Sequence, residues 1–280
     1  MMIPLFKEAQ RLKQTGSGGN VGLYYEKFYD GWVNGVAAQG ENKEPAAKKK
    51  FFSDVTDIYK ENCSKSGLDL LESYRSRRYR LARVLKGRIL QSSTLWRFVS
   101  WLGATHPSET GFIWHRTLGV PYLPGSSLKG AVRAWLTYWD SDKERKERVR
   151  ELFGDTEGGQ GKVIFFDVLP VVCPKLELDI MNPHYAPYYS SNNPEENPPG
   201  DYYSPNPIHF LTVAPGQKFE FIVAPAPNSD LGETDMDQVV KLLESALCTI
   251  GCGAKTAVGY GLFKFDKQTE SIFREIEAEE

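Results

Sequence analysis

Residues 235–265 read DMDQVVKLLESALCTIGCGAKTAVGYGLFKF and divide into a helix, a glycine loop and a strand. Apolar residues recur every three or four positions over 235–250, which is the period of a helix with one buried face. These residues are Val239, Leu242, Leu243, Ala246, Leu247 and Ile250. Gly251 can adopt the left-handed conformation that ends a helix. The apolar run LFKF that follows the loop predicts a closing strand.

The loop between these elements is rich in glycine, with Gly251, Gly253, Gly259 and Gly261 inside eleven residues. Exposed amides in such turns can form an anion-binding nest, and Lys255 would add a positive charge beside Thr256. Ala254 stands where a P-loop requires glycine, and a Rossmann fingerprint would open a helix after a strand rather than the reverse. Two interpretations stay open: a tight connection whose glycines serve packing, and an anion site.

A second amphipathic helix is predicted upstream, over SSLKGAVRAWLTYW at 126–139. Ser126 or Ser127 is expected to cap its first turn. Lys129 and Arg133 form a basic pair four residues apart on one face. The free amides at a helix N-terminus suit a phosphate, and an ordinary capped helix start is the alternative.

The remaining strands are predicted from shorter apolar runs. KVIFFDVLP (162–170) reads as a buried strand, LWRFVSWL (95–102) as an aromatic strand, and 209–225 as a β-hairpin that turns at Pro215–Gly216. Residues 170–227 hold 12 of the 17 prolines, so no regular helix is expected there and the segment reads as a long insertion. The resulting order predicts an α+β fold with a ferredoxin-like (RRM-like) β-α-β-β-α-β core.

We expect three regions. Residues 1–85 form a partly helical N-terminal extension, with a loop at 15–20, a polar linker at 39–50 and the start of a helix over 68–90. Residues 86–266 form the core, interrupted by the insertion at about 170–207, and 267–280 form an acidic tail.

Composition excludes several classes of protein. The 280 residues are 41% hydrophobic, which is enough for a core and argues against wholesale disorder. No apolar run is long enough to cross a membrane, and MMIPLFKEAQRLK lacks the apolar region of a secretory signal, so a cytoplasmic protein is expected. The four cysteines show neither CxxC spacing nor disulfide density, which fits a reducing compartment.

The net charge of −2 lacks the usual sign of a nucleic-acid binder, so basic residues would have to be concentrated locally. Seven basic residues and no acid lie between Arg75 and Arg88, while acids gather in the tail at 270–280. The run, which includes Arg77 and Arg78, is either a solvated helix face or an anion-binding surface.

Two of these motifs together resemble a known family. PYLPGSSLKGAVR (121–133) and GCGAKTAVGYGLF (251–263) are similar to the paired signatures of the RAMP superfamily of CRISPR proteins. The resemblance narrows with HPSETGFIWHRTLGV (106–120), LFGD (152–155), LDIMNPHYAPYY (178–189) and PNPIHFLTV (205–213), which follow in the order of one family. That family is the sixth subunit of the type III-B Cmr effector complex, and the similarity covers about residues 95–265.

The resemblance implies a non-catalytic scaffold without a metal or other cofactor. Such a subunit holds the 3′ part of the guide RNA (crRNA) near its target RNA, caps the filament of repeated backbone subunits, and adjoins the head subunit and the small helical subunit. The insertion would press against the guide–target duplex. The RNA-binding residues are expected to be Ser126, Ser127, Lys129, Arg133, Gly251, Gly253, Lys255, Thr256, Gly259, Gly261, Arg77, Arg78 and His184.

A scaffold that accepts any guide sequence needs phosphate contacts and stacking rather than base-edge readout. Aromatic residues of the insertion can supply stacking, or they can pack on their own domain: Tyr185, Tyr188, Tyr189, Tyr202 and Tyr203.

Two other functions stay open. A ribonuclease would need a general base, for which His184 with Asp179 is the best pair, or clustered carboxylates, for which Asp167 and Asp179 are the candidates. A protein-only adaptor would use tryptophans at its interfaces, although most of them are expected in the core: Trp96, Trp101, Trp114, Trp135 and Trp139.

Overall fold

The computed structural model describes residues 20–265, apart from 30–31, 34–35, 38–43, 66, 156–158, 192, 194, 201, 206 and 228. The predicted acidic tail and almost all of the predicted loop at 15–20 lie outside these residues. The chain combines helices with antiparallel sheets, which confirms the expected α+β class. Within the described residues, none of the helices has the length and apolar character needed to cross a membrane.

The main sheet has the strand order β4-β8-β3-β9, and every neighbouring pair is antiparallel. Its strands are β4 (Val163–Phe165), β8 (Lys218–Pro225), β3 (Arg88–Thr94) and β9 (Phe263–Phe265), and the short β5 (Leu169–Pro170) pairs with another part of β8. The two central strands are aligned so that Ile89 lies opposite Ile222.

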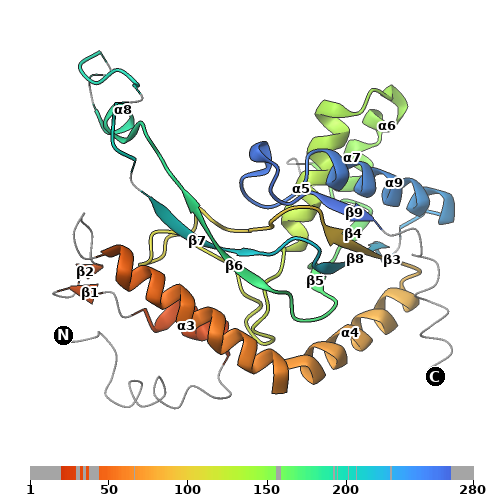
Figure 1. Cartoon of the computed structure of the whole chain (residues 1–280). Helices are drawn as coiled ribbons and strands as arrows, with labels where there is room; N and C mark the ends of the chain where they lie inside the picture. The colour runs from red at the N-terminus through yellow and green to blue at the C-terminus, as the bar shows by residue number, and fades with distance from the viewer. Residues whose placement is uncertain are drawn as a thin grey trace.

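Two helices cover one face of this sheet, as Figure 1 shows. α5 (Gly125–Ala134) continues through a π-helical turn, η1 (Trp135–Trp139), and α9 (Glu233–Thr249) packs beside it. Their buried residues meet buried aromatic side chains of the strands, such as Phe221 and Phe263. The helices predicted at 126–139 and 235–250 are therefore confirmed. Two short helices follow η1, α6 (Lys143–Glu147) and α7 (Val149–Phe153).

The opposite face of the sheet is covered by α4 (Gly67–Val84). Glu220 of β8 is completely buried beneath this helix, and its carboxylate accepts from Arg75 Nη2 at 3.0 Å. The Tyr79 hydroxyl also donates to Glu220. Beside this ion pair, Ala82, Ile89 and Ile222 form a small apolar cluster. The helix that carries the arginine run is thus held to the sheet partly by charge.

The N-terminal segment shares the main hydrophobic core. α2 (Val21–Lys27) and α3 (Glu44–Lys65) contribute Tyr25 and Phe51 to the same cluster as the sheet, and a small pair of strands lies between them, β1 (Trp32–Val33) and β2 (Val36–Ala37). Residues 44–50, expected as part of a linker, are the first turns of α3. Their Lys- and Ala-rich sequence has good helix propensity, and Lys48 is buried beside Glu109.

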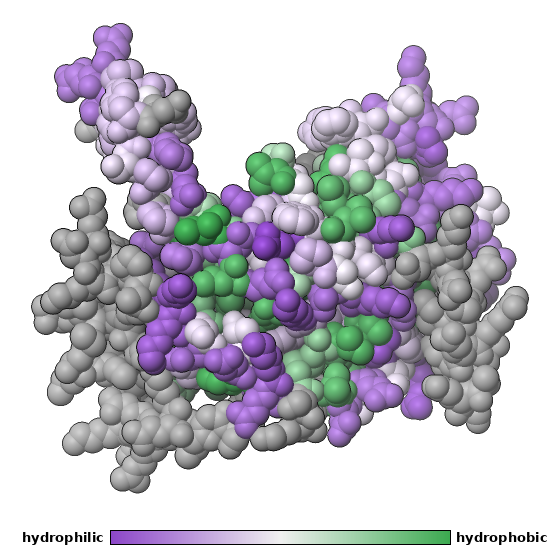
Figure 2. Space-filling model, viewed as in Figure 1, coloured by the Kyte–Doolittle hydropathy of each residue, from purple (hydrophilic) through white to green (hydrophobic). Residues whose placement is uncertain are grey.

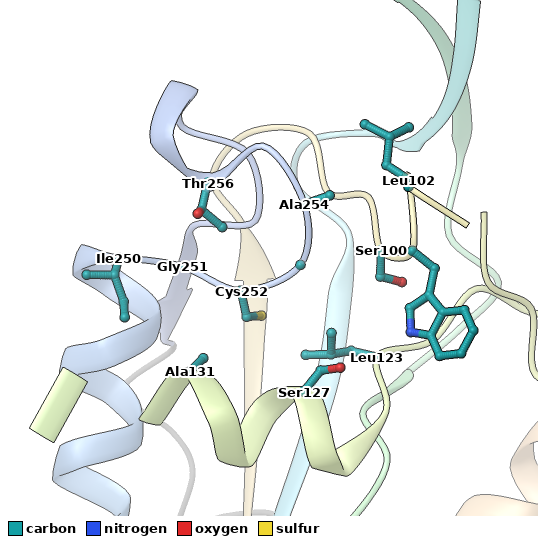
Figure 3. Close-up of a pocket in the computed structure, with 13 residues that line it drawn as sticks. Ser100, Leu102, Leu123, Ser127, Ala131, Ile250, Gly251, Cys252, Ala254 and Thr256 are labelled. Carbon is teal, nitrogen blue, oxygen red and sulfur yellow. The ribbon is translucent and has the colours of Figure 1, made fainter. Parts of the chain in front are cut away.

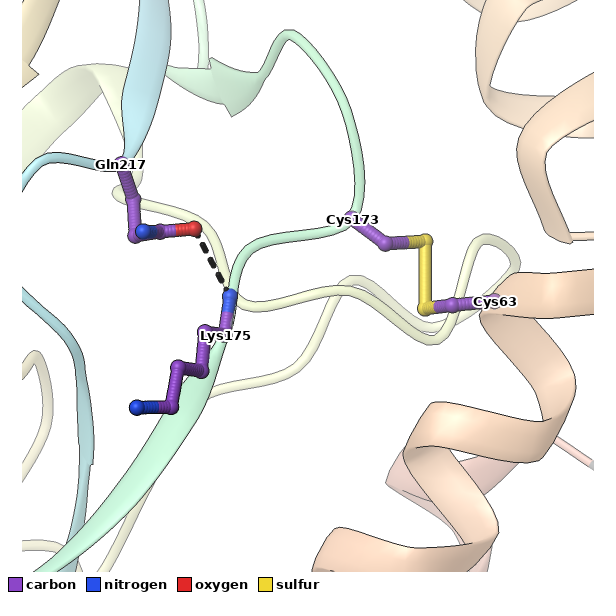
Figure 4. The surroundings of a disulfide bond; sticks show 4 residues. All are labelled: Cys63, Cys173, Lys175 and Gln217. Atoms are coloured by element: carbon purple, nitrogen blue, oxygen red, sulfur yellow. Dashed lines mark hydrogen bonds between the residues drawn. A yellow bond between two sulfur atoms is a disulfide. The ribbon is translucent and has the colours of Figure 1, made fainter.

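A disulfide bond joins Cys63 of α3 to Cys173, which follows β5 (Figure 4). The expectation that all four cysteines are reduced is wrong for this pair, whose Cα atoms lie 5.9 Å apart. The two residues are separated by 110 positions, so no local spacing could indicate their proximity. The thiols of Cys248 and Cys252 are free.

The proline-rich insertion contains a two-stranded ribbon that projects from the body (Figure 1). It consists of β6 (Leu176–Met181) and β7 (Ile208–Val213), with α8 (Ala186–Ser190) near its tip. α8 contradicts the prediction that residues 170–227 contain no helix. Pro187 lies in its first turn, where the missing amide would have no helical partner. Figure 2 shows the tip standing clear of the body, with a concave edge between the tip and the helices.

The predicted hairpin over 209–225 is wrong, because β7 and β8 belong to different sheets. The chain does turn near Pro215–Gly216, but the end of β3 lies between the two strands. The Gly216 amide donates to the Thr94 carbonyl at 2.7 Å, and the Thr94 hydroxyl donates to the Ala214 carbonyl at 3.0 Å. β7 therefore pairs with β6, and β8 pairs with β3.

The boundaries predicted around residue 90 are also wrong. α4 ends at Val84 rather than residue 90, and the polar segment 88–94 is the strand β3. Gly87 makes this turn possible, because a Cβ there would lie 2.8 Å from the Val223 carbonyl oxygen. The aromatic stretch 95–102 has a single bridge, between Phe98 and Val213, instead of a strand. The single strand predicted at 162–170 is divided into two short strands, β4 and β5, while the strand predicted at LFKF is present as β9.

Candidate nucleic-acid interface

The two RAMP-like motifs, more than a hundred residues apart in sequence, line one cavity of about 430 Å³ (Figure 3). The first turns of α5 contribute Ser127 and Ala131. The remaining lining comes from the glycine loop and from the segment that follows Phe98: Gly251, Cys252, Gly253, Ala254, Thr256, Ser100, Trp101, Leu102 and Gly103, with Leu123 and Ile250. The structure thus brings together Ser127, Gly251, Gly253 and Thr256 of the predicted set.

Three of the four loop glycines are required by close packing. At Gly261, with φ +69°, a Cβ would lie 1.8 Å from the Cys252 carbonyl oxygen, and at Gly251, with φ +70°, it would lie 2.7 Å from that of Gly261. A Cβ at Gly253 would lie 2.4 Å from the Val99 carbonyl oxygen. Gly259 has φ +92° but open space around it. The packing interpretation therefore explains Gly251, Gly253 and Gly261.

Hydrogen bonds within the fold use most of the loop amides. Cys252 donates to Gly261, Ala254 donates to Val99 at 2.8 Å, and Gly261 donates to Arg97 at 2.9 Å. Among the described residues, four loop amides donate no hydrogen bond: those of Gly253, Lys255, Thr256 and Ala257. An anion nest in this loop is restricted to these groups, at the start of the short helix η2 (Thr256–Val258).

Lys255 is half-buried and lies over aromatic rings. The Lys255 backbone has φ +60°. The Lys255 ammonium lies 5.7 Å from the ring centre of Phe210 and 5.8 Å from that of Tyr260. The Tyr260 hydroxyl in turn donates to Asp179 at 2.6 Å. Burial and the Asp179 carboxylate together raise the pKa of Tyr260 to about 12, so the phenol stays neutral. The charge of Lys255 is therefore positioned by cation–π contacts.

The start of α5 is capped by Asp167, not by a serine. The N-cap residue is Pro124, and the Asp167 carboxylate accepts from the Gly125 amide at 2.7 Å. A carboxylate thus already occupies part of the anion position at this helix N-terminus. From the sequence, Asp167 was expected only as a candidate metal-binding carboxylate. Its proximity to Gly125 depends on β4 packing beside α5.

The other predicted residues of α5 remain available. Ser126 is exposed, while Lys129 and Arg133 are partly exposed on successive turns. Within the described part of the chain neither Lys129 nor Arg133 forms an ion pair. These two side chains keep their positive charges uncompensated next to the cavity-lining turns.

The arginine run is divided between the core and the surface. Arg78 is only 7% exposed and donates to the Asp167 carbonyl, and burial lowers the pKa of its guanidinium. Little of the Arg78 guanidinium is therefore accessible to a bound RNA in this fold. Arg77 is exposed and lies over the Tyr74 ring at 5.4 Å. It lies on α4, across the sheet from α5.

The structure does not bring the proposed ribonuclease pair together. His184 is exposed near α8, whereas Asp179 is held on β6 by Tyr260 and by Arg97 at 3.4 Å. No hydrogen bond or ion pair links His184 to Asp179 in the described residues. Those residues also contain no group of three or more His, Cys, Asp or Glu side chains arranged to hold a metal ion.

Trp101 is a cavity residue that the sequence indicated only as a possible interface residue. Trp114 is buried and Trp135 is partly buried, but Trp96, Trp101 and Trp139 are largely exposed, so the expectation that most of the five lie in the core is wrong. Of these exposed side chains, Trp101 lines the cavity described above. Only the tertiary position of the loop distinguishes it from the other two.

Comparison with known proteins identifies the family to which this chain belongs. The RAMP superfamily model matches residues 100–264. The CRISPR system Cmr subunit Cmr6 of Pyrococcus furiosus is 35% identical, over 59% of this chain and 64% of that protein. The Cmr6 subunit of Saccharolobus solfataricus is 24% identical, over 94% of this chain and 86% of that protein.

The chain therefore spans just under two thirds of the length of the Pyrococcus relative. A solved chain of the type III-B Cmr-β complex bound to cognate target RNA has the same fold, with a TM-score of 0.57 and 20% identity over 92% of this chain and 94% of that chain. The matched segment contains both motifs that line the cavity. The chain therefore belongs to the RAMP superfamily, and its resemblance to the Cmr6 subunits of type III-B CRISPR systems is confirmed.

Proposed function

We propose that this chain is a non-catalytic scaffold subunit of a type III-B CRISPR complex that acts in the cytoplasm and binds the 3′ part of the crRNA. It would cap the filament of repeated backbone subunits and contact the head subunit, the small helical subunit and the target RNA. The names of the relatives support this assignment, since the two matched proteins are Cmr6 subunits and the matched solved chain comes from a complex bound to target RNA.

One observation carries the proposal: the PGSSLKG turn and the glycine loop, distant in sequence, form a single cavity. Ser127 and Thr256 place hydroxyl groups on it, and Lys129 and Arg133 are close to it on the same helix. Hydroxyls, free amides and unpaired cations are the groups that bind an RNA backbone without reading its sequence.

The topology supports a ferredoxin-like core. Taken in chain order, the four main strands are β3, β4, β8 and β9, with α5 after the first and α9 after the third. Their order across the sheet, β4-β8-β3-β9, places the first and third strands at the centre. In this chain α4 covers the sheet face that RRM domains use for RNA. RNA would therefore bind at the α5 and glycine-loop edge.

The projecting ribbon supports contact with the guide–target duplex. Exposed aromatic side chains gather towards its tip, with Tyr189 and Tyr202 exposed by 79% and 72%. Rigid aromatic surfaces of this kind stack on nucleic-acid bases regardless of sequence. His184 lies on the same projection and would contribute to this surface.

The proposal is tested by filter binding of the full chain to a single-stranded RNA at several salt concentrations. The double variant Lys129→Ala/Arg133→Ala should bind more weakly. Its plot of log K against log[salt] should also fall less steeply, by about 1.4 in slope, because each phosphate contact to a single strand contributes about −0.7. Lys60→Ala, which removes an exposed cation of α3, is the matched control and should keep the wild-type slope. Equal slopes for both variants would contradict the site.

A further inference from the structure

Two cavities of the molecule share Trp101 in their lining. The first is the 430 Å³ cavity at α5 and the glycine loop. The second has about 560 Å³ and lies between the end of α2 and the loop over 101–117. Trp101 lines both, and its side chain is 56% exposed. The two cavities therefore have one accessible tryptophan in common.

The backbone that carries this indole is fixed on both sides. The Val99 carbonyl accepts from Ala254 at 2.8 Å, and the Leu102 carbonyl accepts from Gly111 at 3.0 Å. Gly111 itself packs against the loop, since a Cβ there would lie 2.4 Å from the Trp101 carbonyl oxygen. The indole thus lies on a rigid platform, which reduces the entropy that a ligand would have to remove.

Trp101 has φ +60°, a conformation that bulky residues rarely adopt and that glycine adopts freely. Folding alone would favour a small residue at an exposed position with this backbone. A large exposed aromatic here costs conformational energy, and such outliers cluster at ligand-binding sites.

The second cavity combines aromatic walls with cations near its opening. Phe112 and Tyr122 contribute the walls. Lys27 and Arg116 are exposed cations of its lining, and Glu26 and Asp167 are its carboxylates. The Asp167 carboxylate already accepts from the Gly125 amide. Flat apolar surfaces beside cations fit a nucleotide, whose base is planar and whose phosphate is anionic.

We propose that Trp101 is a stacking platform for one unpaired base of a bound RNA strand. The strand's backbone passes from Ser127 and Thr256 in the first cavity to Lys27 and Arg116 in the second. This inference rests on the proposed function, which supplies the RNA, and it adds a base contact to what was a backbone-binding site. The platform accepts any base, because stacking uses the face of the ring.

The test compares Trp101→Gly, Trp101→Phe and Trp139→Ala in the full chain. Glycine removes the indole and also relieves the positive φ, so Trp101→Gly should be at least as stable to heat as the wild type. It should nevertheless bind a single-stranded RNA about tenfold or more weakly. The RNA affinity of Trp101→Phe should be within a few-fold of that of the wild type. Trp139, which is 64% exposed on η1, is the matched control and should not affect RNA binding.

A second arm uses a set of RNAs, each with one abasic residue at a different position. At the stacked position the wild type should lose affinity, and wild type and Trp101→Gly should bind that RNA equally. Unchanged RNA affinity of Trp101→Gly overturns the inference while leaving the proposed function intact. The inference is also overturned if the RNA affinity of Trp101→Gly is reduced by the same factor on every abasic RNA. Failure of the wild type to bind RNA overturns the proposed function and this inference with it.

Discussion

At the scale of single residues, Gly259 and Gly261 of the glycine loop differ in the space that each leaves for a side chain. Gly261 and Gly259 both have positive φ, so both favour glycine over a residue with a side chain. Only Gly261 is also enclosed by backbone, with the Cys252 carbonyl where its Cβ would be. The loop closes onto the strand β9 through this contact.

We expect Gly261→Ala to destabilise the fold far more than Gly259→Ala. Gly259→Ala carries the left-handed penalty of about 1–2 kcal/mol. Gly261→Ala adds a steric conflict that must move the loop, and its loss should exceed 3 kcal/mol. Urea unfolding of the two variants measures the difference, and equal losses would contradict the packing interpretation.

Glu220 is a second residue whose role depends on burial. It carries a charge on a central strand and is balanced by Arg75 of α4. We expect Glu220→Ala to lower the free energy of unfolding by about 3–5 kcal/mol, because it leaves the largely buried Arg75 guanidinium without its carboxylate. Asp57→Ala, which breaks the exposed pair with Lys60, should change it by less than about 1 kcal/mol. A small effect of Glu220→Ala in chemical denaturation would show that α4 does not need this charge.

At the scale of elements, the disulfide joins the long helix α3 to the chain that leads into the projecting ribbon. Cys63 lies near the C-terminal end of α3, and Cys173 lies between β5 and β6. The bond therefore connects the N-terminal segment to the base of the ribbon.

Reduction or Cys63→Ser should lower the free energy of unfolding by about 2–4 kcal/mol, since cross-linking distant residues restricts the unfolded chain. Cys248→Ser, at an exposed free thiol, provides the control and should leave the unfolding curve unchanged. Denaturation with and without dithiothreitol measures the effect. Identical curves would mean that the bond adds no stability.

At the scale of the whole molecule, a half-buried histidine connects the N-terminal segment to the core. His106 stacks on Tyr25 of α2 with ring centres 4.3 Å apart. Its Nε2–H donates to the Tyr25 carbonyl at 2.9 Å, and its Nδ1 accepts from the Ser108 amide at 3.1 Å. The contact with Ser108 requires the neutral ring, because a protonated Nδ1 cannot accept a hydrogen bond. Burial lowers the pKa of His106, and also that of His115.

The folded state therefore takes up fewer protons than the unfolded state once the pH falls towards the ordinary histidine pKa of about 6.5. Stability should be constant above that pH and decrease below it, by at most about 1.4 kcal/mol per pH unit for each histidine. His106→Gln should flatten this dependence between pH 7 and 5.5, whereas His184→Gln, at an exposed position, should retain it. Thermal melts across this range provide the measurement, and a wild-type curve that stays flat would refute the assignment.

Local sequence patterns predicted the elements whose residues are neighbours in the chain. The three- and four-residue spacing gave α5 and α9, the glycine loop gave the end of α9, and the paired motifs gave the family. These features depend on backbone conformation and on one buried face, both of which a short stretch of sequence encodes.

Tertiary structure decided every feature that joins distant residues. β7 pairs with β6 because the end of β3 separates it from β8, and Asp167 rather than a serine caps α5 because β4 packs beside that helix. Arg78 is buried although it lies in a run of arginines, and Trp101 is exposed although it lies in an aromatic stretch. Burial and long-range hydrogen bonds depend on which elements meet, and that choice is made by the whole chain.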